Sequence, residues 1–463
     1  MILDHLDNPP PVSCLRLFPP ELMKRYSVFP FAFDEESGVV SVAMSDCFDF
    51  DLIAELQAVS GLWVMPAKAK LAQIAEWIDV YASHSSRVKA VSSGVSKGSS
   101  SAVRMVDEIL SEAMHSGASD IHFEPGEREF LVRFRKDGVL TVVRRLPVRS
   151  VAEILSRIKI MSGLDIAERR RPQDGRIHFS DGSREVDIRV SALPTDYGQK
   201  VVLRLLDKGN VIHDLDALGM LPEHVESVEK EIRKPYGMFL VTGPTGSGKT
   251  TTLYTLLQMI RSSTINISTI EEPIEYKIPG IIQTAVNPKI DLTFASALRT
   301  LLRQDPDVIM VGEIRDSETA ELAIRAALTG HLVFSTLHTN DAPSAIVRLI
   351  DMGIEPFLLA SALNLVMAQR LVRRVCSHCH GETTEKVRCV YCGGSGFRGR
   401  LAIYEMMPMS EQIRELVHSG SGLADIREAA KKEGMATLAE DGAKKVALNW
   451  TTEAEVASEA MGD

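Results

Sequence analysis

A glycine-rich run that ends in a lysine and a threonine is the part of the sequence best suited to chemistry. Residues 243–250 read Gly-Pro-Thr-Gly-Ser-Gly-Lys-Thr, after an apolar segment at 236–241 and before a helical pattern at 251–260. This is the GxxxxGK[ST] pattern in its strand, loop and helix context, in which Lys249 reaches the β- and γ-phosphates and the Thr250 hydroxyl can ligate Mg²⁺. The sequence therefore predicts a site for a nucleoside triphosphate and magnesium. The candidate residues are Gly243, Pro244, Thr245, Gly246, Ser247, Gly248, Lys249, Thr250 and Thr251.

Two apolar segments further along the chain end in carboxylates. Glu271 follows one of these segments and Glu313 follows the other. In an open α/β sheet, ligands lie beyond the carboxyl ends of the strands, so these groups should converge on the phosphates. Their expected tasks are polarising a water molecule and holding Mg²⁺. For Glu275 and Asp316 we expect helix capping or a surface ion pair instead.

Two histidines flank a further predicted strand at 332–337. At about 3.3 Å per residue, the seven extended residues from His331 to His338 span about 23 Å, so both side chains cannot reach one γ-phosphate. We expect His338, which follows the strand, to sense the phosphate. For His331 two interpretations stay open, a structural histidine or a role at a neighbouring subunit.

Four of the six cysteines form a C-x2-C-x9-C-x2-C pattern, comprising Cys376, Cys379, Cys389 and Cys392. Four thiolates suit tetrahedral Zn²⁺, and a complete cysteine set leaves no open position for water, so the metal would be structural. A redox pair is the alternative. We expect the zinc insert to cover residues 371–400.

The elements that must position these residues fall into several predicted parts. Residues 1–82 show strand-like alternation followed by a helical pattern, and 83–102 is a serine-rich segment typical of a flexible linker. A second mixed α/β domain is expected at 103–208, with a helix from Val103 to Met114 and antiparallel strands after it. Residues 209–463 carry the phosphate-binding motif and the cysteines.

Charge is distributed unevenly along the chain. Residues 128–208 hold 18 Lys and Arg against 11 Asp and Glu, a net charge of +7, while the remainder carries −17. Fourteen of these 18 cations are arginines, the side chain best suited to bidentate phosphate contacts. The second domain is therefore a candidate to face the nucleotide, and a solvated charged sheet face is the alternative.

Composition excludes other classes of function. The 463-residue chain has a net charge of −10, which argues against nonspecific nucleic-acid binding as its main task. Its N-terminus lacks the basic and apolar regions of a secretory signal, and no apolar run approaches the roughly 18 residues of a membrane span. We therefore expect a cytoplasmic protein that reaches a membrane only through a partner.

These motifs together resemble those of the secretion ATPases of type II and type IV systems. Residues 243–251, 269–275, 302–316 and 329–340 resemble the Walker A, Asp box, Walker B and His box of that superfamily. Residues 118–125, 171–176 and 396–405, together with the tetracysteine insert, are similar to type II secretion (general secretion pathway protein E) and type IV pilus assembly ATPases. The N-terminal segment resembles their platform-docking domain.

The resemblance implies a fold and an activity. The fold would be α/β, with a RecA-like P-loop ATPase domain preceded by a PAS-like mixed domain and a small docking domain. The activity would be ATP hydrolysis by a homo-hexamer with ATP, Mg²⁺ and Zn²⁺, which moves an inner-membrane platform protein and so drives pseudopilus assembly and protein export.

The resemblance also implies roles for single residues. Glu271 would be the general base and Glu313 the Walker B carboxylate, while Arg189 and Arg204 would reach the nucleotide from the second domain, across a subunit boundary. The sequence departs from the family at two positions. Glu272 stands where Asp is usual and Gln199 where Glu is usual; because neither belongs to the P-loop, we expect activity to persist.

Three other functions compete with the type II secretion motor. A type IV pilus extension ATPase is the alternative within the family. A nucleic-acid translocase is a candidate from a different class, but the acidic net charge and the lack of an aromatic and basic strip disfavour it. A regulatory protein without hydrolysis is disfavoured because Lys249, Glu271 and Glu313 are all present.

Overall fold

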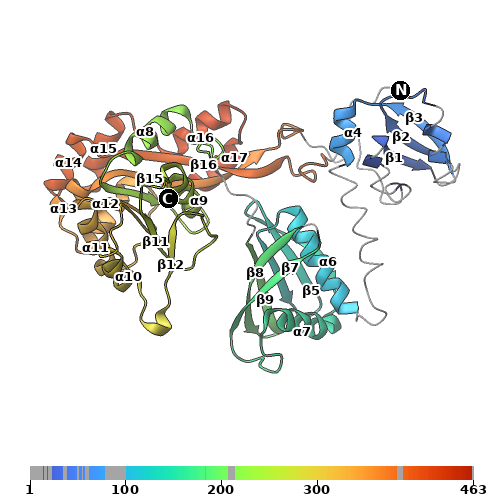
Figure 1. Cartoon of the computed structure of the whole chain (residues 1–463), viewed down its shortest axis with the longest axis horizontal. Helices are drawn as coiled ribbons and strands as arrows, with labels where there is room; N and C mark the ends of the chain where they lie inside the picture. Colours follow the sequence, from blue (N-terminus) through green and yellow to red (C-terminus); the bar gives the residue numbers. More distant parts are fainter. Residues whose placement is uncertain are drawn as a thin grey trace. The chain divides into compact units, whose positions relative to one another are not determined.

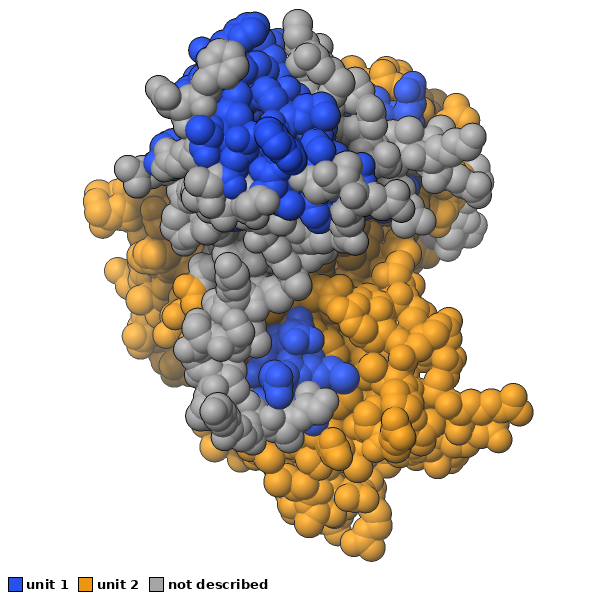
Figure 2. Space-filling model, turned by 90° about the vertical axis from the view of Figure 1, so that its right-hand side faces the viewer, with its two compact units in different colours: residues 1–108, 376–397 blue, residues 109–375, 398–463 orange. Residues whose placement is uncertain are grey.

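The computed structural model describes most of the chain as two compact units, coloured separately in Figure 2. The first unit comprises residues 1–108 and 376–397, and the second comprises 109–375 and 398–463. In the part of the chain that the structure describes, no helix combines the length and apolar character needed to cross a membrane. The described residues are 14, 18, 23, 24, 26–34, 39–49, 52–54, 56, 57, 62–78, 101–182, 184–206, 214–382 and 389–460. The predicted linker at 83–102 lies outside them except for its last two residues.

A small sheet forms the described core of the N-terminal segment. Its strands are β1 (Phe29–Asp34), β2 (Val39–Met44) and β3 (Trp63–Lys68), in the order β1-β2-β3. β1 pairs antiparallel and β3 pairs parallel with β2. Helix α4 (Leu71–Trp77) contributes Ile74 and Trp77 to the apolar cluster of this sheet.

An antiparallel sheet follows the predicted linker. Among the described residues it has six strands in the order β6-β5-β4-β9-β8-β7. Figure 1 labels β5, β7, β8 and β9 of this sheet, with helices α6 and α7. Alternating buried and partly exposed positions show that one face of β4 and β5 packs on a core, which is the pattern that the sequence predicted. The elements are α6 (Ser101–Ser116), β4 (Asp120–Pro125), β5 (Phe130–Lys136), β6 (Val139–Leu146), η2 (Val148–Ser150), α7 (Val151–Ser162), β7 (Gln173–Ser180), β8 (Glu185–Thr195) and β9 (Gly198–Leu206).

The C-terminal part is built on a sheet of seven described strands, in the order β12-β11-β13-β14-β10-β15-β16. The pairings of β12 with β11, β11 with β13, β13 with β14, and β10 with β14 and β15 are parallel, so these strands have their carboxyl ends at one edge. The strands are β10 (Gly237–Thr242), β11 (Ile267–Glu271), β12 (Ile282–Ala285), β13 (Val308–Val311), β14 (Leu332–Leu337), β15 (Leu363–Val375) and β16 (Phe397–Pro408).

Apolar side chains pack on both faces of this sheet. Residues of β10 alternate between two apolar clusters, Met238 and Leu240 in one and Phe239 and Val241 in the other. The first cluster includes residues of α10 to α13, and the second includes residues of α8 and α9. A strand covered on both faces reads as a continuous apolar run, which is how β10, β13 and β14 stand out in the sequence.

Helices connect these strands and complete the C-terminal part. Their starts are fixed locally: Asp316 caps α11, since its carboxylate accepts the Thr319 N–H at 2.8 Å, as the sequence predicted. The helices are α8 (Pro222–Ile232), α9 (Lys249–Ile260), η3 (Pro288–Ile290), α10 (Phe294–Leu301), α11 (Ser317–Leu328), α12 (Ala342–Asp351), α13 (Pro356–Ala362), α14 (Glu411–His418), α15 (Leu423–Lys432), α16 (Leu438–Ala447) and α17 (Glu453–Ala460).

Candidate functional site

The glycine-rich loop lies between the carboxyl end of β10 and the start of α9. Gly243, Gly246 and Gly248 have φ angles of 148°, 86° and 89°, a region that residues with a Cβ rarely adopt. A Cβ at Gly243 would come within 2.5 Å of the Gln369 carbonyl oxygen, and one at Gly248 within 2.8 Å of the Gln369 side chain. The loop therefore depends on glycine both for its backbone conformation and for its close approach to β15.

Lys249 is the buried cation of this loop. Its side-chain ammonium donates to the carbonyl oxygens of Gly243 at 2.6 Å and Pro244 at 3.1 Å, and the residue is only 9% exposed. Burial lowers the pKa of Lys249 to about 8, against the opposing effect of Glu313. The next residue, Thr250, is exposed at the first turn of α9, where its hydroxyl could ligate Mg²⁺.

Glu313 contacts Arg315 and His338 and acts on Lys249 through its charge. One of its carboxylate oxygens lies 3.5 Å from Nε2 of His338, and the other lies 2.6 Å from the guanidinium of Arg315. The pKa of His338 is lowered, first by burial and then by the charge of Lys249. The groups predicted at the ends of β10, β13 and β14 are thus brought together around Lys249.

Glu271 has an environment that the sequence did not predict. It is only 3% exposed, and its carboxylate accepts hydrogen bonds from the Tyr254 hydroxyl, from Thr269 Oγ1 at 2.6 Å and from Gln283 Nε2 at 3.0 Å. A carboxylate that accepts three donors has little capacity left for a water proton. The assignment of Glu271 as general base stays a prediction.

The other acidic residues after β11 face outward. The Glu272 carboxylate accepts from Arg315 at 2.8 Å, so the unusual glutamate at this position joins the ion pairs around Glu313. The Glu275 side chain is 41% exposed and lies 3.4 Å from the guanidinium of Arg189. The surface ion pair expected for Glu275 is therefore present, and Glu275 stays accessible from solvent.

The arginines of the second domain lie in one row across its sheet. Arg176, Arg189 and Arg204 occupy directly opposed positions on β7, β8 and β9. Directly opposed residues project from the same face of a sheet. The register therefore places Arg189 and Arg204 side by side on one face of the sheet.

Within the chain these arginines already have partners. Arg189 donates to the Ile274 carbonyl at 3.1 Å, in addition to its pairing with Glu275. Arg204 donates to Asp120 at 2.9 Å while its side chain remains 63% exposed. Their predicted reach toward a nucleotide across a subunit boundary stays a prediction.

Two further sequence expectations concern single side chains. Nδ1 of His331 lies 3.0 Å from the Ala326 carbonyl oxygen, which supports the structural interpretation of this histidine. Gln199 is buried near the start of β9, opposite Pro194, and its Nε2 has no hydrogen-bond partner among the described residues. Nothing in the structure explains the glutamine at this position.

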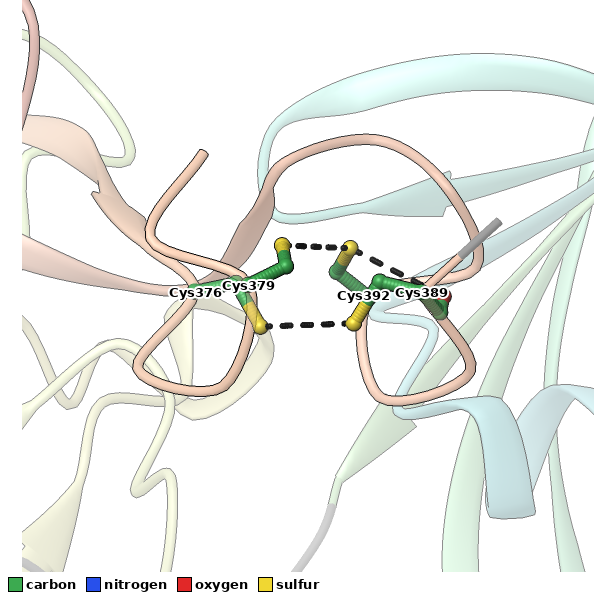
Figure 3. A group of neighbouring side chains, drawn as sticks. All are labelled: Cys376, Cys379, Cys389 and Cys392. Carbon is green, nitrogen blue, oxygen red and sulfur yellow. Dashed lines mark hydrogen bonds between the residues drawn. The ribbon is translucent and has the colours of Figure 1, made fainter. Parts of the chain in front are cut away.

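The four cysteines form one cluster (Figure 3). Their sulfur atoms all lie within 4.8 Å of one another, with 3.9 Å between Cys376 and Cys389 and 3.8 Å between Cys379 and Cys392. A tetrahedral ion with bonds of about 2.3 Å to sulfur places its ligands about 3.8 Å apart, whereas a disulfide needs about 2.05 Å. The cluster therefore fits a four-coordinate metal better than a redox pair.

Several side chains around the site escaped sequence reasoning. Tyr254, Gln283 and Gln369 lie on α9, β12 and β15, and none belongs to a recognised motif. Gln369 accepts from Thr252 Oγ1 at 2.8 Å and donates to the Ser247 carbonyl at 2.8 Å. Strand β15 is therefore hydrogen-bonded to both the glycine-rich loop and the start of α9. Only Thr269 had a local signal, since it lies two residues before Glu271 on one strand and so shares its face.

Comparisons with known proteins agree with this site. Residues 95–458 match the family described as Type II/IV secretion system protein, and residues 2–88 match the MshEN domain. Type II secretion system protein HxcR of Pseudomonas aeruginosa is 52% identical over 357 residues, 76% of this chain and 76% of that protein. Type IV pilus assembly ATPase PilB of Thermus thermophilus is 43% identical over 493 aligned positions, which cover 98% of this chain and 55% of that protein.

Solved structures show the same fold. The pilus retraction motor PilT with bound ADP has a TM-score of 0.55 at 28% identity, covering 77% of this chain and 97% of its own. The ATPase DotB of Legionella pneumophila has a TM-score of 0.61 at 23% identity, covering 80% of this chain and 98% of its own, which is a likeness of fold alone. The predicted α/β fold with a P-loop ATPase domain is confirmed.

The low pKa of Lys249 predicts a pH-dependent nucleotide affinity. Phosphate binding needs the charged ammonium, and in the free site this group titrates at about 8. Below that pH the lysine is already protonated, and above it binding must take up a proton. We expect ADP to bind about tenfold more weakly at pH 9 than at pH 7 in calorimetric titrations.

A variant with a permanent charge is the control. In Lys249→Arg the guanidinium stays protonated, so whatever its absolute affinity, its dissociation constant should not change between pH 7 and pH 9. Equal wild-type affinities at the two pH values would contradict the titration of Lys249.

Proposed function

Because the chain belongs to the type II/IV secretion system protein family, we propose that it is the ATPase that drives pseudopilus assembly and protein export in a type II secretion system. It is an ATP-hydrolysing P-loop enzyme. The observation that carries the proposal is the convergence of Lys249, Glu313 and His338 at the carboxyl edge of the parallel sheet. These groups can bind phosphates, hold a divalent cation and respond to the γ-phosphate.

Each residue has a proposed task in hydrolysis. Lys249 would exchange its two carbonyl partners for phosphate oxygens, and Thr250 and Glu313 would hold Mg²⁺, which supplies charge stabilisation when bound. His338, 3.5 Å from Glu313, would respond to the γ-phosphate. Arg189 and Arg204 would add positive charge from the second domain of a neighbouring subunit in a hexamer.

Two glutamates compete for the role of general base. The sequence resemblance assigns it to Glu271, but the Glu271 carboxylate is buried and accepts hydrogen bonds from three donors. The Glu275 carboxylate is exposed, which makes it the better candidate. A base must reach the water from which it takes a proton. We propose Glu275 for this role.

Four cysteine thiolates are proposed to bind one Zn²⁺ ion. The sulfur spacing fits this ion, and a site closed by protein ligands stabilises the fold and takes no part in hydrolysis. We further propose that residues 1–82 bind the cytoplasmic domain of an inner-membrane platform protein, so that a cytoplasmic enzyme acts at the membrane.

The alternatives within and outside the family are less well supported. HxcR is more similar to this chain than PilB is, at 52% against 43% identity, although the PilB alignment covers more of the chain. A type IV pilus assembly role therefore stays the second candidate. A nucleic-acid translocase is disfavoured by the net charge of −10.

The base assignment predicts different pH profiles for two variants. Glu275→Gln should keep ATP binding, lower kcat by about 10² or more and lose the acidic limb of the kcat profile. Glu271→Gln should lower kcat but keep that limb, because the titrating base remains. The reverse pattern would assign the base to Glu271.

A metal measurement tests the cysteine cluster. Protein purified without chelator should contain one zinc per chain, and Cys389→Ser should lose most of it and melt at a lower temperature. Cys47→Ser, outside the cluster, should retain the zinc. Well under one zinc per wild-type chain would refute the assignment.

Mixing experiments test whether the arginines act across subunits. Arg204→Ala and Lys249→Ala subunits should each be nearly inactive, since an arginine at a P-loop site can be worth about 10³ in rate. Mixed oligomers should regain turnover, because some boundaries pair an intact loop with an intact arginine. Arg145→Ala, at the edge strand β6, is the control and should keep wild-type activity. Mixed oligomers as inactive as their components would contradict the trans arrangement.

Truncation tests the docking proposal. A chain without residues 1–101 should still hydrolyse ATP but should no longer retain the purified cytoplasmic domain of the platform protein from the same organism. Retained binding would place the docking surface elsewhere. Restoration of export in a secretion-deficient strain by the full chain, but not by Lys249→Ala, tests the overall function.

A further inference from the structure

The Tyr254 hydroxyl is a buried junction between the P-loop helix and the loop after β11. Tyr254 lies five residues after Lys249 in α9 and is fully buried. Its hydroxyl donates to the Glu271 carboxylate and accepts the Glu275 backbone N–H at 3.3 Å. One oxygen atom therefore links α9 to both ends of the segment 271–275.

Gln283 holds the second half of the same loop. This residue lies on β12, opposite Thr269 of β11. Its amide nitrogen donates to Glu271 at 3.0 Å and to the Tyr276 carbonyl at 3.1 Å, and its amide oxygen accepts the Ile278 N–H at 2.8 Å. The side chain thus ties residues 276–278 to the end of β11.

The charge of Glu271 makes this arrangement specific. A carboxylate that is 3% exposed is stable only while its hydrogen-bond donors remain in place. Burial and the charge of Glu271 both raise the pKa of Tyr254, which keeps its hydroxyl protonated and able to donate. Displacing the tyrosine or the glutamine would leave a buried charge with fewer donors.

The outer side of the loop faces the catalytic groups. Arg315 contacts Glu272 at 2.8 Å and Glu313 at 2.6 Å, and so connects the start of the loop to Glu313. The charge of Glu313 in turn acts on Lys249 by raising its pKa. The Glu275 carboxylate projects to solvent from the same loop. The inner contacts of Tyr254 and Gln283 therefore determine where the outer carboxylates lie.

We propose that Tyr254, Glu271 and Gln283 are positioning residues for hydrolysis, which hold loop 272–279 so that Glu275 is placed relative to the P-loop helix. The inference rests on the proposed ATPase function. It differs from a role in core stability alone, because it assigns the Tyr254 hydroxyl to the geometry of the reacting groups and not to nucleotide affinity.

Tyr254→Phe tests this role by removing one oxygen atom from the full chain without opening a cavity. Hydrogen exchange in residues 272–279 should accelerate, because the Glu275 N–H loses its acceptor. The kcat for ATP should fall about tenfold or more, since small displacements of reacting groups are costly, while KM and ADP affinity stay within about twofold. Gln283→Met should give the same pattern and serves if Tyr254→Phe does not fold.

Thr269→Val is the matched control. It removes another donor to the same carboxylate, 2.6 Å from Glu271, on the strand itself and with no described hydrogen bond to loop 272–279. It should lower the melting temperature, because the buried Glu271 loses a donor, while its exchange in 272–279 and its kcat stay close to those of the wild type.

Three results would overturn the inference: unchanged exchange in Tyr254→Phe, accelerated exchange with unchanged kcat, or equal losses of kcat in Thr269→Val and Tyr254→Phe. The exchange measurement needs no turnover. If the wild-type protein failed to hydrolyse ATP, the proposed function would fail, and exchange would still report separately on the loop.

Discussion

The buried charge of Lys249 is the interaction on which the arrangement of the site depends. An ammonium that is 9% exposed and bonded to two carbonyl oxygens of its own loop is poorly compensated until an anion arrives. The loop conformation that produces this burial needs three glycines with positive φ and the support of Gln369 from β15. The glycines thus allow the loop conformation that phosphate binding needs. A bound phosphate would also stabilise Lys249, because it would neutralise a buried charge.

The parallel sheet supplies the remaining groups. Because β10, β11, β13 and β14 run in the same direction, the residues after each strand arrive at one edge. Glu313, His338 and Arg315 meet there, and Glu272 joins them through Arg315. Glu313 and Glu272 lie in ion pairs at this edge, whereas Glu271 is buried and accepts hydrogen bonds from three side chains.

The second domain contributes a row of arginines. The antiparallel register orders its arginines into one row, in which Arg189 is paired with Glu275 and Arg204 with Asp120. The contacts of Arg189 with Ile274 and Glu275 connect this row to the loop after β11 within one chain. Tyr254 and Gln283 therefore contact that loop on its buried side. Arg189 contacts it on its exposed side, through the ion pair with Glu275.

The phosphate loop, the strand-end carboxylates, the histidine pair and the cysteine cluster could be predicted from the sequence alone, because each depends on residue types at short and fixed spacings. The sequence also indicated the three sheets, since alternating and continuous apolar patterns reflect burial on one or both faces. The domain boundaries, however, remain predictions. The surroundings of each carboxylate, by contrast, are visible only in the folded chain. Tyr254 and Gln283 lie 17 residues before and 12 residues after Glu271 and meet it only through packing and the parallel pairing of β11 with β12, so no local pattern could show that Glu271 is enclosed and Glu275 exposed.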